Sequence, residues 1–196
     1  MRFPCLVASL FAATAATADS PYCDLPQSEW ETISYADLIG EWSVAFIIGM
    51  VMTEAGPFPE FEREDWPATI YVEDSALKMF YRDNIHDLAL ATDENFNFDD
   101  LQSFGPFPND EEGDLLTYLE NISNDFFGMQ SGCTDIADLP QFTVTGKVQE
   151  HPWDNDLRIY LKMIEPGLIA GFEHFETRNG DAVFDNVAVI LMSGEE

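Results

Sequence analysis

Segments in which polar and apolar residues alternate recur along most of this chain. A period of two is typical of β-strands that turn one face to a core and the other to solvent. Within residues 141–150, for example, Phe142, Val144 and Val148 fall on one face and Thr143 and Thr145 on the other. The alternation predicts strands over residues 69–72, 77–82, 86–93, 141–150, 156–164, 167–177 and 182–192.

Residues 42–52 form an uncharged run of eleven, which raises the question of a membrane segment. A membrane-spanning helix needs about twenty apolar residues, so this run is too short. Val44, Phe46, Ile47 and Ile48 are β-formers, and Gly49 weakens a helix. We therefore expect a first strand that is buried on both faces, which brings the number of predicted strands to eight.

Four predicted strands precede residues 93–140 and four follow them. This insertion carries one predicted helix, over residues 114–128, where leucines recur at helical spacing and Gly128 is placed to end the helix. The tetrapeptide Gly-Pro-Phe-Pro occurs twice, at 56–59 and 105–108, and predicts two rigid loops. The expected fold is all-β, an eight-stranded antiparallel up-and-down barrel with one inserted helix between strands 4 and 5, since closure removes exposed strand edges. A two-sheet sandwich is the rival architecture.

The first eighteen residues have the pattern of a secretory signal peptide. Arg2 precedes an apolar stretch, and Ala16 and Ala18 supply small residues before a cleavage site. Cleavage after Ala18 leaves a single domain, residues 19–196, and predicts a periplasmic or extracellular location. Cys23 and Cys133 survive this cleavage, and an even pair in an oxidising compartment predicts a disulfide.

The chain carries 37 Asp and Glu against 8 Lys and Arg, a formal net charge of −29. Such a field repels phosphates and anionic lipid headgroups, so we expect neither nucleic acid binding nor membrane insertion. The cysteines and the three histidines lack the spacing of a metal site, and no cofactor-binding motif occurs, so neither metal nor cofactor is expected. The acidity itself favours solubility, and the sequence leaves open whether there is a protein partner.

Gly40-Glu41-Trp42 precedes the first predicted strand and follows a cysteine-bearing tail. This tripeptide resembles the G-x-W motif that opens lipocalins and other calycins. The resemblance implies a barrel that binds a small hydrophobic molecule, with Trp42 packed across the barrel floor and Gly40 allowing the tight turn into the strand.

The expected function is therefore a secreted or periplasmic binding protein for a small apolar ligand held in the barrel. Abundant Phe and Met suit an adaptable apolar cavity. The alternatives are a calycin-type isomerase or cyclase acting in the cavity, and a non-catalytic acidic interaction module with a filled barrel. The candidate ligand-binding residues are Trp42, Phe46, Val72, Met79, Tyr81, Phe142, Phe172, His174 and Asp185.

The last hairpin supplies the one candidate acid–base pair. Asn179-Gly180 is a strong signal for a two-residue turn, because both central residues of a type I′ turn need a positive φ. A turn at these residues places His174 opposite Asp185. If their face is the interior, the pair anchors the polar end of a ligand or serves the enzyme alternative; otherwise it is a solvated cross-strand pair.

Overall fold

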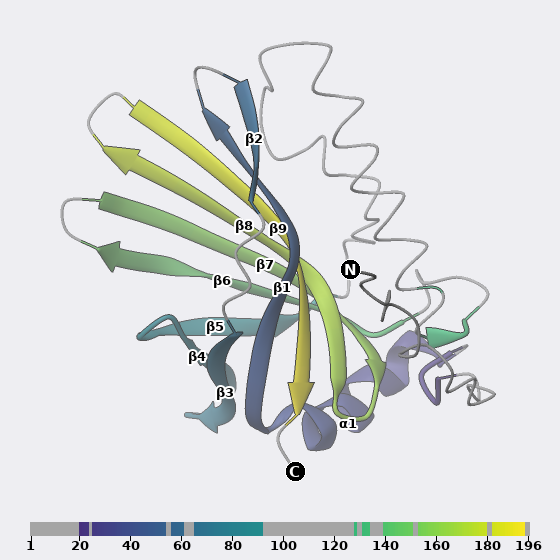
Figure 1. The fold of residues 1–196 in the computed structure, drawn as a ribbon. Helices are drawn as coiled ribbons and strands as arrows, with labels where there is room; N and C mark the ends of the chain where they lie inside the picture. The colour runs from purple at the N-terminus through teal and green to yellow at the C-terminus, as the bar shows by residue number, and fades with distance from the viewer. Residues whose placement is uncertain are drawn as a thin grey trace, which may run out of the picture.

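A computed structural model of the protein describes residues 20–23, 25–53, 56–60, 65–91, 128, 131–133, 139–150, 153–179 and 182–194. Within these residues nine strands form one antiparallel sheet in the order β2-β1-β3-β4-β5-β6-β7-β8-β9. An additional pairing of β1 with β9 closes all strands except β2 into an eight-stranded barrel, as the alternation predicts (Figure 1). The strands are β1 (Gly40–Thr53), β2 (Gly56–Glu60), β3 (Asp65–Glu73), β4 (Ala76–Tyr81), β5 (Asn84–Leu90), β6 (Gln141–Glu150), β7 (Trp153–Glu165), β8 (Leu168–Asn179) and β9 (Ala182–Gly194).

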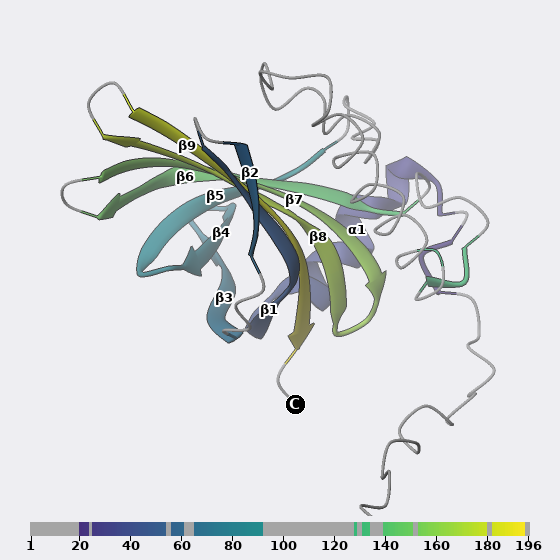
Figure 2. The same cartoon turned by 45° about the horizontal axis from the view of Figure 1, so that its top comes forward.

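The barrel wall has two heights. Strands β3, β4 and β5 contain 9, 6 and 7 residues, whereas β1 and β6 to β9 contain 10 to 14. The long strands extend past the end of the short ones as a twisted sheet (Figures 1 and 2). We call this the open end of the barrel, and the opposite end, where β1 begins and β9 stops, the closed end.

Helix α1 (Gln27–Leu38) lies at the closed end (Figure 1) and is not predicted from the sequence. Its polar and apolar residues are barely segregated, so it lacks the amphipathic pattern that reveals a helix. Leu38 is fully buried, and its carbonyl oxygen accepts a hydrogen bond of 2.8 Å from Trp42 Nε1. Gly40 joins helix and strand with φ of +157°, which favours glycine. Trp42, 3% exposed, thus lies at the closed end beside the chain that enters β1.

Two expectations, one about the first strand and one about the segment that follows it, are wrong. The register of β1 against β9 shifts between Phe46 and Ile48, and Ile47 is 43% exposed, so β1 is not buried on both faces. The first Gly-Pro-Phe-Pro is a strand, β2, that pairs with residues 49–53 of β1. Its two prolines are tolerated because β2 is an edge strand, which needs hydrogen bonds on one side only.

The last hairpin has a different register from the one expected. Asn179 pairs with Ala182, so the two residues between the strands are Gly180 and Asp181 rather than Asn179 and Gly180. His174 consequently lies opposite Val187. Twelve cross-strand pairs, many of them buried, outweigh the preference of Asn-Gly for the two central positions of the turn.

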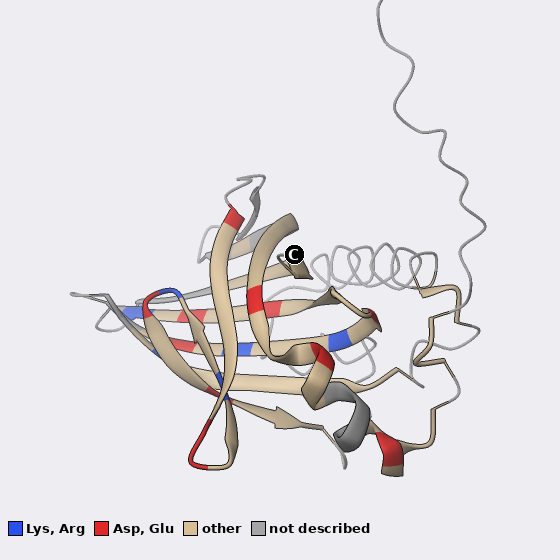
Figure 3. Cartoon of the chain, turned by 90° about the horizontal axis from the view of Figure 1, so that it is seen from below, with Lys and Arg blue, Asp and Glu red and all other residues tan. Residues whose placement is uncertain are grey.

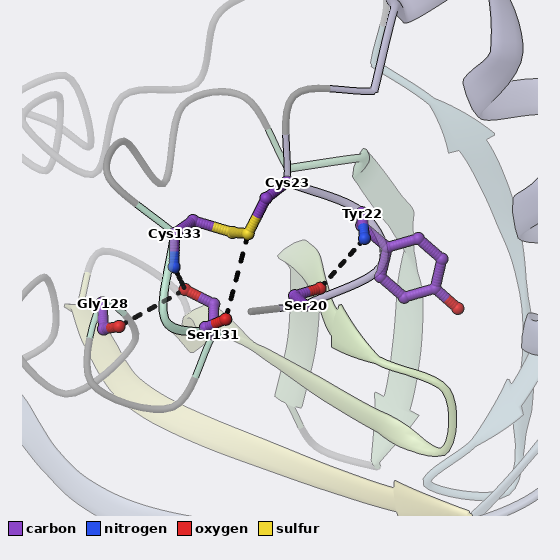
Figure 4. The surroundings of a disulfide bond; sticks show 6 residues. All are labelled: Ser20, Tyr22, Cys23, Gly128, Ser131 and Cys133. Carbon is purple, nitrogen blue, oxygen red and sulfur yellow. Dashed lines mark hydrogen bonds between the residues drawn. A yellow bond between two sulfur atoms is a disulfide. The ribbon is translucent and has the colours of Figure 1, made fainter. Parts of the chain in front are cut away.

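A disulfide joins Cys23 to Cys133 across 110 residues, as predicted (Figure 4). The two chain segments also pair directly, since Ser20 N donates a hydrogen bond of 2.8 Å to the Ser131 carbonyl oxygen. Tyr22 is 1% exposed, and its hydroxyl donates to Asp37 Oδ2 of α1 at 2.7 Å. The disulfide therefore attaches the chain that precedes α1 to the chain that precedes β6.

The predicted signal peptide, residues 1–18, and the predicted inserted helix, residues 114–128, lie outside the described residues, apart from Gly128. Among the helices that are described, none is both long and apolar enough to span a membrane.

Candidate functional site

The barrel interior toward the closed end is filled with apolar side chains. Strand pairing and the period of two place them inward from every wall strand. Val44, Ile70, Met79, Ile159 and Ile190 each have 0% exposed surface. A void that holds even one water molecule would expose the atoms that line it, so no such void touches these five side chains.

A polar cluster crosses the barrel where this filled region ends, on the side of the open end. The Tyr81 hydroxyl donates a hydrogen bond of 2.7 Å to Glu173 Oε2, and Arg82 Nη2 donates one of 2.9 Å to Glu173 Oε1. Three strands separate β4 from β8 by either route around the barrel, so these contacts join opposite walls. We call these three residues the cross-barrel cluster.

Arg82 lies in a turn whose backbone directs its side chain into the barrel. Arg82 and Asp83 have φ of 49° and 59° and connect Tyr81 to Asn84, which pair across β4 and β5. Positive φ at both central residues defines a type I′ turn, in which Asn, Asp or Gly is usual. Asn84 Nδ2 supports the turn by donating to the Arg82 carbonyl oxygen at 2.6 Å. An arginine in this turn lies where the short strands β4 and β5 end, on the side of the open end, and its side chain can reach across the interior.

Four aromatic rings surround the Arg82 guanidinium. Its Cζ lies 4.9 Å from the ring centroid of Trp66, 5.3 Å from those of Phe46 and Phe175, and 5.5 Å from that of Tyr81. Cations are attracted to aromatic faces within about 6 Å of the centroid. Phe46, Trp66 and Phe175 keep part of their surface accessible. The open side of the cluster is therefore an aromatic surface around a charge that Glu173 balances.

The electrostatics of the cluster favour the ion pair. Burial lowers the pKa of Arg82. The charge of Glu173 and the contacts with Tyr81 together raise that pKa by more than burial lowers it, so the net shift is upward. The pKa of Tyr81 rises because burial and the Glu173 charge both disfavour a phenolate. Tyr81 is thus a neutral donor, Arg82 is a cation and Glu173 accepts from both. Arg82 Nε is buried and has no hydrogen-bond partner among the described residues.

His86 lies on β5 beside the cluster and is 1% exposed. Its Nε2 lies 3.1 Å from the Tyr81 carbonyl oxygen; since a carbonyl can only accept, Nε2 carries the proton. Nδ1 has no hydrogen-bond partner in the described part of the chain and lies against Gly146, where an added Cβ would come within 2.1 Å of it. Burial lowers the pKa of His86, and this outweighs the opposing effects of the Tyr81 carbonyl and Asp87.

Mild acid is expected to weaken the fold through His86. The unfolded imidazole takes up a proton near pH 6.5, but the folded one has a lower pKa and binds fewer protons. The free energy of unfolding is therefore unaffected by His86 above about pH 7.5 and decreases as the pH falls through 6.5, by at most about 1.4 kcal/mol per pH unit, until the folded imidazole is also protonated. Urea denaturation at several pH values, compared between wild type and His86→Phe, measures this loss. The comparison cancels the titration of the many carboxylates, and parallel pH curves for the two proteins would contradict the prediction.

The structure places five of the predicted ligand-binding residues inside the barrel. Trp42, Met79, Tyr81 and Phe142 are buried there, and Phe46 lies near Arg82. Trp42, Met79 and Phe142 belong to the filled region. Of the five, only Tyr81, a member of the cross-barrel cluster, and Phe46, beside Arg82, belong to the candidate site.

The other predicted site residues lie elsewhere. Val72 is 50% exposed at the end of β3. Phe172 and His174 alternate with the inward-facing Glu173, so they lie on the outer face of β8, where they are nevertheless buried. The backbone of Asp185 pairs with Glu176, not with His174. His174 and Asp185 are therefore not opposite each other, and His174 lies outside the barrel, which removes the basis for a cavity acid–base pair.

Sequence reasoning did not identify Arg82, Glu173, Trp66 or Phe175 as site residues. Glu173 offers a signal that could have been used, because it occupies an inward position between Gly171 and Phe175. A charge on the apolar face of a strand requires a partner. The identity of that partner depends on the barrel closing, since 91 residues separate Arg82 from Glu173.

No group of three or more His, Cys, Asp or Glu side chains among the described residues is arranged to hold a metal ion. Comparisons with protein-family models, with curated protein sequences and with solved structures found no match to this chain.

Proposed function

We propose that this protein is a non-catalytic binding protein that holds a small apolar, ring-bearing molecule at the open end of its barrel. The ligand would rest on Phe46, Trp66 and Phe175, above the cross-barrel cluster. The observation that carries the proposal is the contrast in exposure along the interior. The five interior side chains named above have no accessible surface, whereas these three rings keep some.

The chemistry of this surface favours a neutral ligand with a flat apolar face. Aromatic rings pair in offset or edge-to-face arrangements that add to the burial of apolar area. The charge of Arg82 is balanced by Glu173 at 2.9 Å, so a charged ligand would have to compete with an existing ion pair. The five fully buried side chains toward the closed end leave no water-sized void beside them, so we expect the ligand to bind near the open end.

Fluorescence titration with a panel of small aromatic molecules tests this proposal. Burying one large apolar side chain contributes about 1.5–3 kcal/mol, so Phe175→Ala is expected to weaken binding about tenfold or more. Phe80→Ala is the matched control, because Phe80 is 41% exposed and adjoins Tyr81 on β4, so it points out of the barrel. Equal losses in both variants, or no saturable binding by any of the panel, would overturn the proposal.

The filled interior also favours a second candidate, a non-catalytic interaction module whose barrel serves only as a scaffold. Acidic residues occur on many of the described elements, as Figure 3 shows, and the net charge is −29. A basic protein partner bound this way should dissociate as salt is raised, since exposed charges are screened beyond about 8–10 Å at 0.1–0.15 M salt. A Kd for such a partner that stays constant between low and high salt would exclude this candidate.

We infer further that the chain is exported to an oxidising compartment and that its barrel is lipocalin-like. The disulfide supports export. The closed eight-stranded barrel and the place of Trp42 at its closed end support the likeness.

A further inference from the structure

Arg158 of β7 is a cation that has no partner among the described residues, in a chain that is rich in acids. The sequence has 37 Asp and Glu for 8 Lys and Arg. Four other cations of the described residues form ion pairs: Lys78 with Asp87, Arg82 with Glu173, Lys147 with Asp156 and Arg178 with Glu176. Arg158 is exposed and, within the described part of the chain, makes no hydrogen bond, ion pair or ring contact.

The carboxylates nearest to Arg158 along the sheet are already paired. Asp156 is two residues away on the same face of β7 and binds Lys147 at 3.3 Å. Asp87 lies opposite Thr145, which in turn lies opposite Arg158, and Asp87 binds Lys78. On the other side the register neighbour of Arg158 is His174 of β8. Among the described residues, the acids nearest to Arg158 therefore leave its guanidinium available.

Arg158 borders a groove on the outer face of the β6–β7 pair. The groove has a volume of about 240 Å³ and is lined by Thr143, Val144, Thr145, Arg158, Ile159 and Tyr160. Thr145 pairs with Arg158 and Thr143 with Tyr160, so four outward side chains frame it. Val144 and Ile159 point inward, which leaves their backbone as the floor. Like Arg158, Thr143 and Thr145 make no side-chain hydrogen bond in the described structure.

We propose that this groove binds a small oxyanion, the carboxylate or phosphate group of a small molecule. A guanidinium offers N–H donors in a planar fork that matches two oxygens of such a group. The hydroxyls of Thr143 and Thr145 can donate to the same oxygens, because side chains opposite each other on paired strands are about 4.5–5.5 Å apart at Cβ. The site lies outside the barrel and is independent of the function proposed for its open end.

Titration of the full chain with inorganic phosphate and, separately, with acetate tests the proposal by amide NMR. We expect saturable shifts at residues 143–145 and 158–160 with a Kd on the order of 1 mM, since few contacts are made and the net charge opposes an anion. Arg158→Gln should weaken binding at least tenfold, and Arg158→Lys, which keeps the charge but not the fork, less so. Saturation by phosphate alone, or by acetate alone, identifies which oxyanion the site takes.

Arg178→Gln is the matched control, because Arg178 is also an exposed arginine on the sheet but is paired with Glu176. It removes the same charge and should leave the Kd unchanged within twofold. Equal weakening by Arg178→Gln and Arg158→Gln would show a general charge effect and overturn the proposal. Absence of saturable shifts with both anions would overturn it as well, and unchanged far-ultraviolet circular dichroism verifies that each variant is folded.

Discussion

Replacing Glu173 with leucine is expected to lower the free energy of unfolding by about 3–5 kcal/mol, the usual result of removing one partner from a buried ion pair. Glu173 is 3% exposed and its two oxygens accept from Tyr81 and Arg82. Without them, a guanidinium whose side chain is only 21% exposed keeps its charge and loses its counter-ion. The phenol hydroxyl loses its acceptor at the same time. Urea denaturation followed by circular dichroism measures the change.

Replacing the whole cluster is expected to cost far less than replacing Glu173 alone. The triple variant Tyr81→Phe, Arg82→Met, Glu173→Leu removes the guanidinium, the carboxylate and the phenol hydroxyl of the cluster together, so none of these three groups is left buried without the others. Apolar replacement of a complete buried ion pair is often neutral or stabilising. The triple variant should therefore regain most of the stability that Glu173→Leu loses, which gives a large favourable coupling among the three substitutions.

Lys147 and Asp156 provide the control pair, because their side chains are 75% and 47% exposed. Exposed ion pairs contribute about 0–1 kcal/mol, so Asp156→Leu should change stability little. If Glu173→Leu loses less than about 1 kcal/mol, or if the triple variant is less stable than Glu173→Leu, the cluster is not the buried, charge-balanced unit that the distances describe.

The strands of this barrel can be predicted because the sequence of each strand indicates which of its faces is buried. In β6 and β7 the inward residues, such as Val144 and Ile159, are apolar, and alternation alone identifies both strands. Elements that do not alternate escape this reasoning. Helix α1 buries Leu38 against Trp42 but has no apolar stripe. Strand β2 contains two prolines, which are acceptable because β2 is an edge strand of the described sheet.

The candidate site is less predictable because it depends on register and closure. The predicted turn at Asn179-Gly180 differs from the observed hairpin by one position, yet this moves the partner of His174 by two residues. The cross-barrel cluster requires β4 and β8 to face each other, which follows only from the pairing of β1 with β9. Local sequence patterns report which face of a strand is buried, but not what lies opposite it.

Removing the disulfide with Cys23→Ser and Cys133→Ser is expected to lower the free energy of unfolding by about 4–5 kcal/mol. The bridge spans 110 residues. In the chain-entropy model, closing a loop of that length lowers the conformational entropy of the unfolded chain, which corresponds to about 4–5 kcal/mol of free energy at 25 °C. The folded contacts around it need not change, since Ser20 still bonds to Ser131 and Tyr22 to Asp37. Denaturation in urea compares the two proteins, and reduced wild type should match the double variant.

The origin of this effect in the unfolded chain can be separated from a local one. A longer unconstrained chain exposes more surface on unfolding, so the denaturant dependence, m, should increase in the double variant. Ser131→Ala is the local control: it removes the hydroxyl that accepts from Cys133 N at 3.2 Å but keeps the covalent bond. It is expected to cost about 0.5–1.5 kcal/mol with m unchanged. A double variant that loses no more than Ser131→Ala, with the same m, would mean that the contacts of this segment, rather than its covalent closure, stabilise the closed end of the barrel.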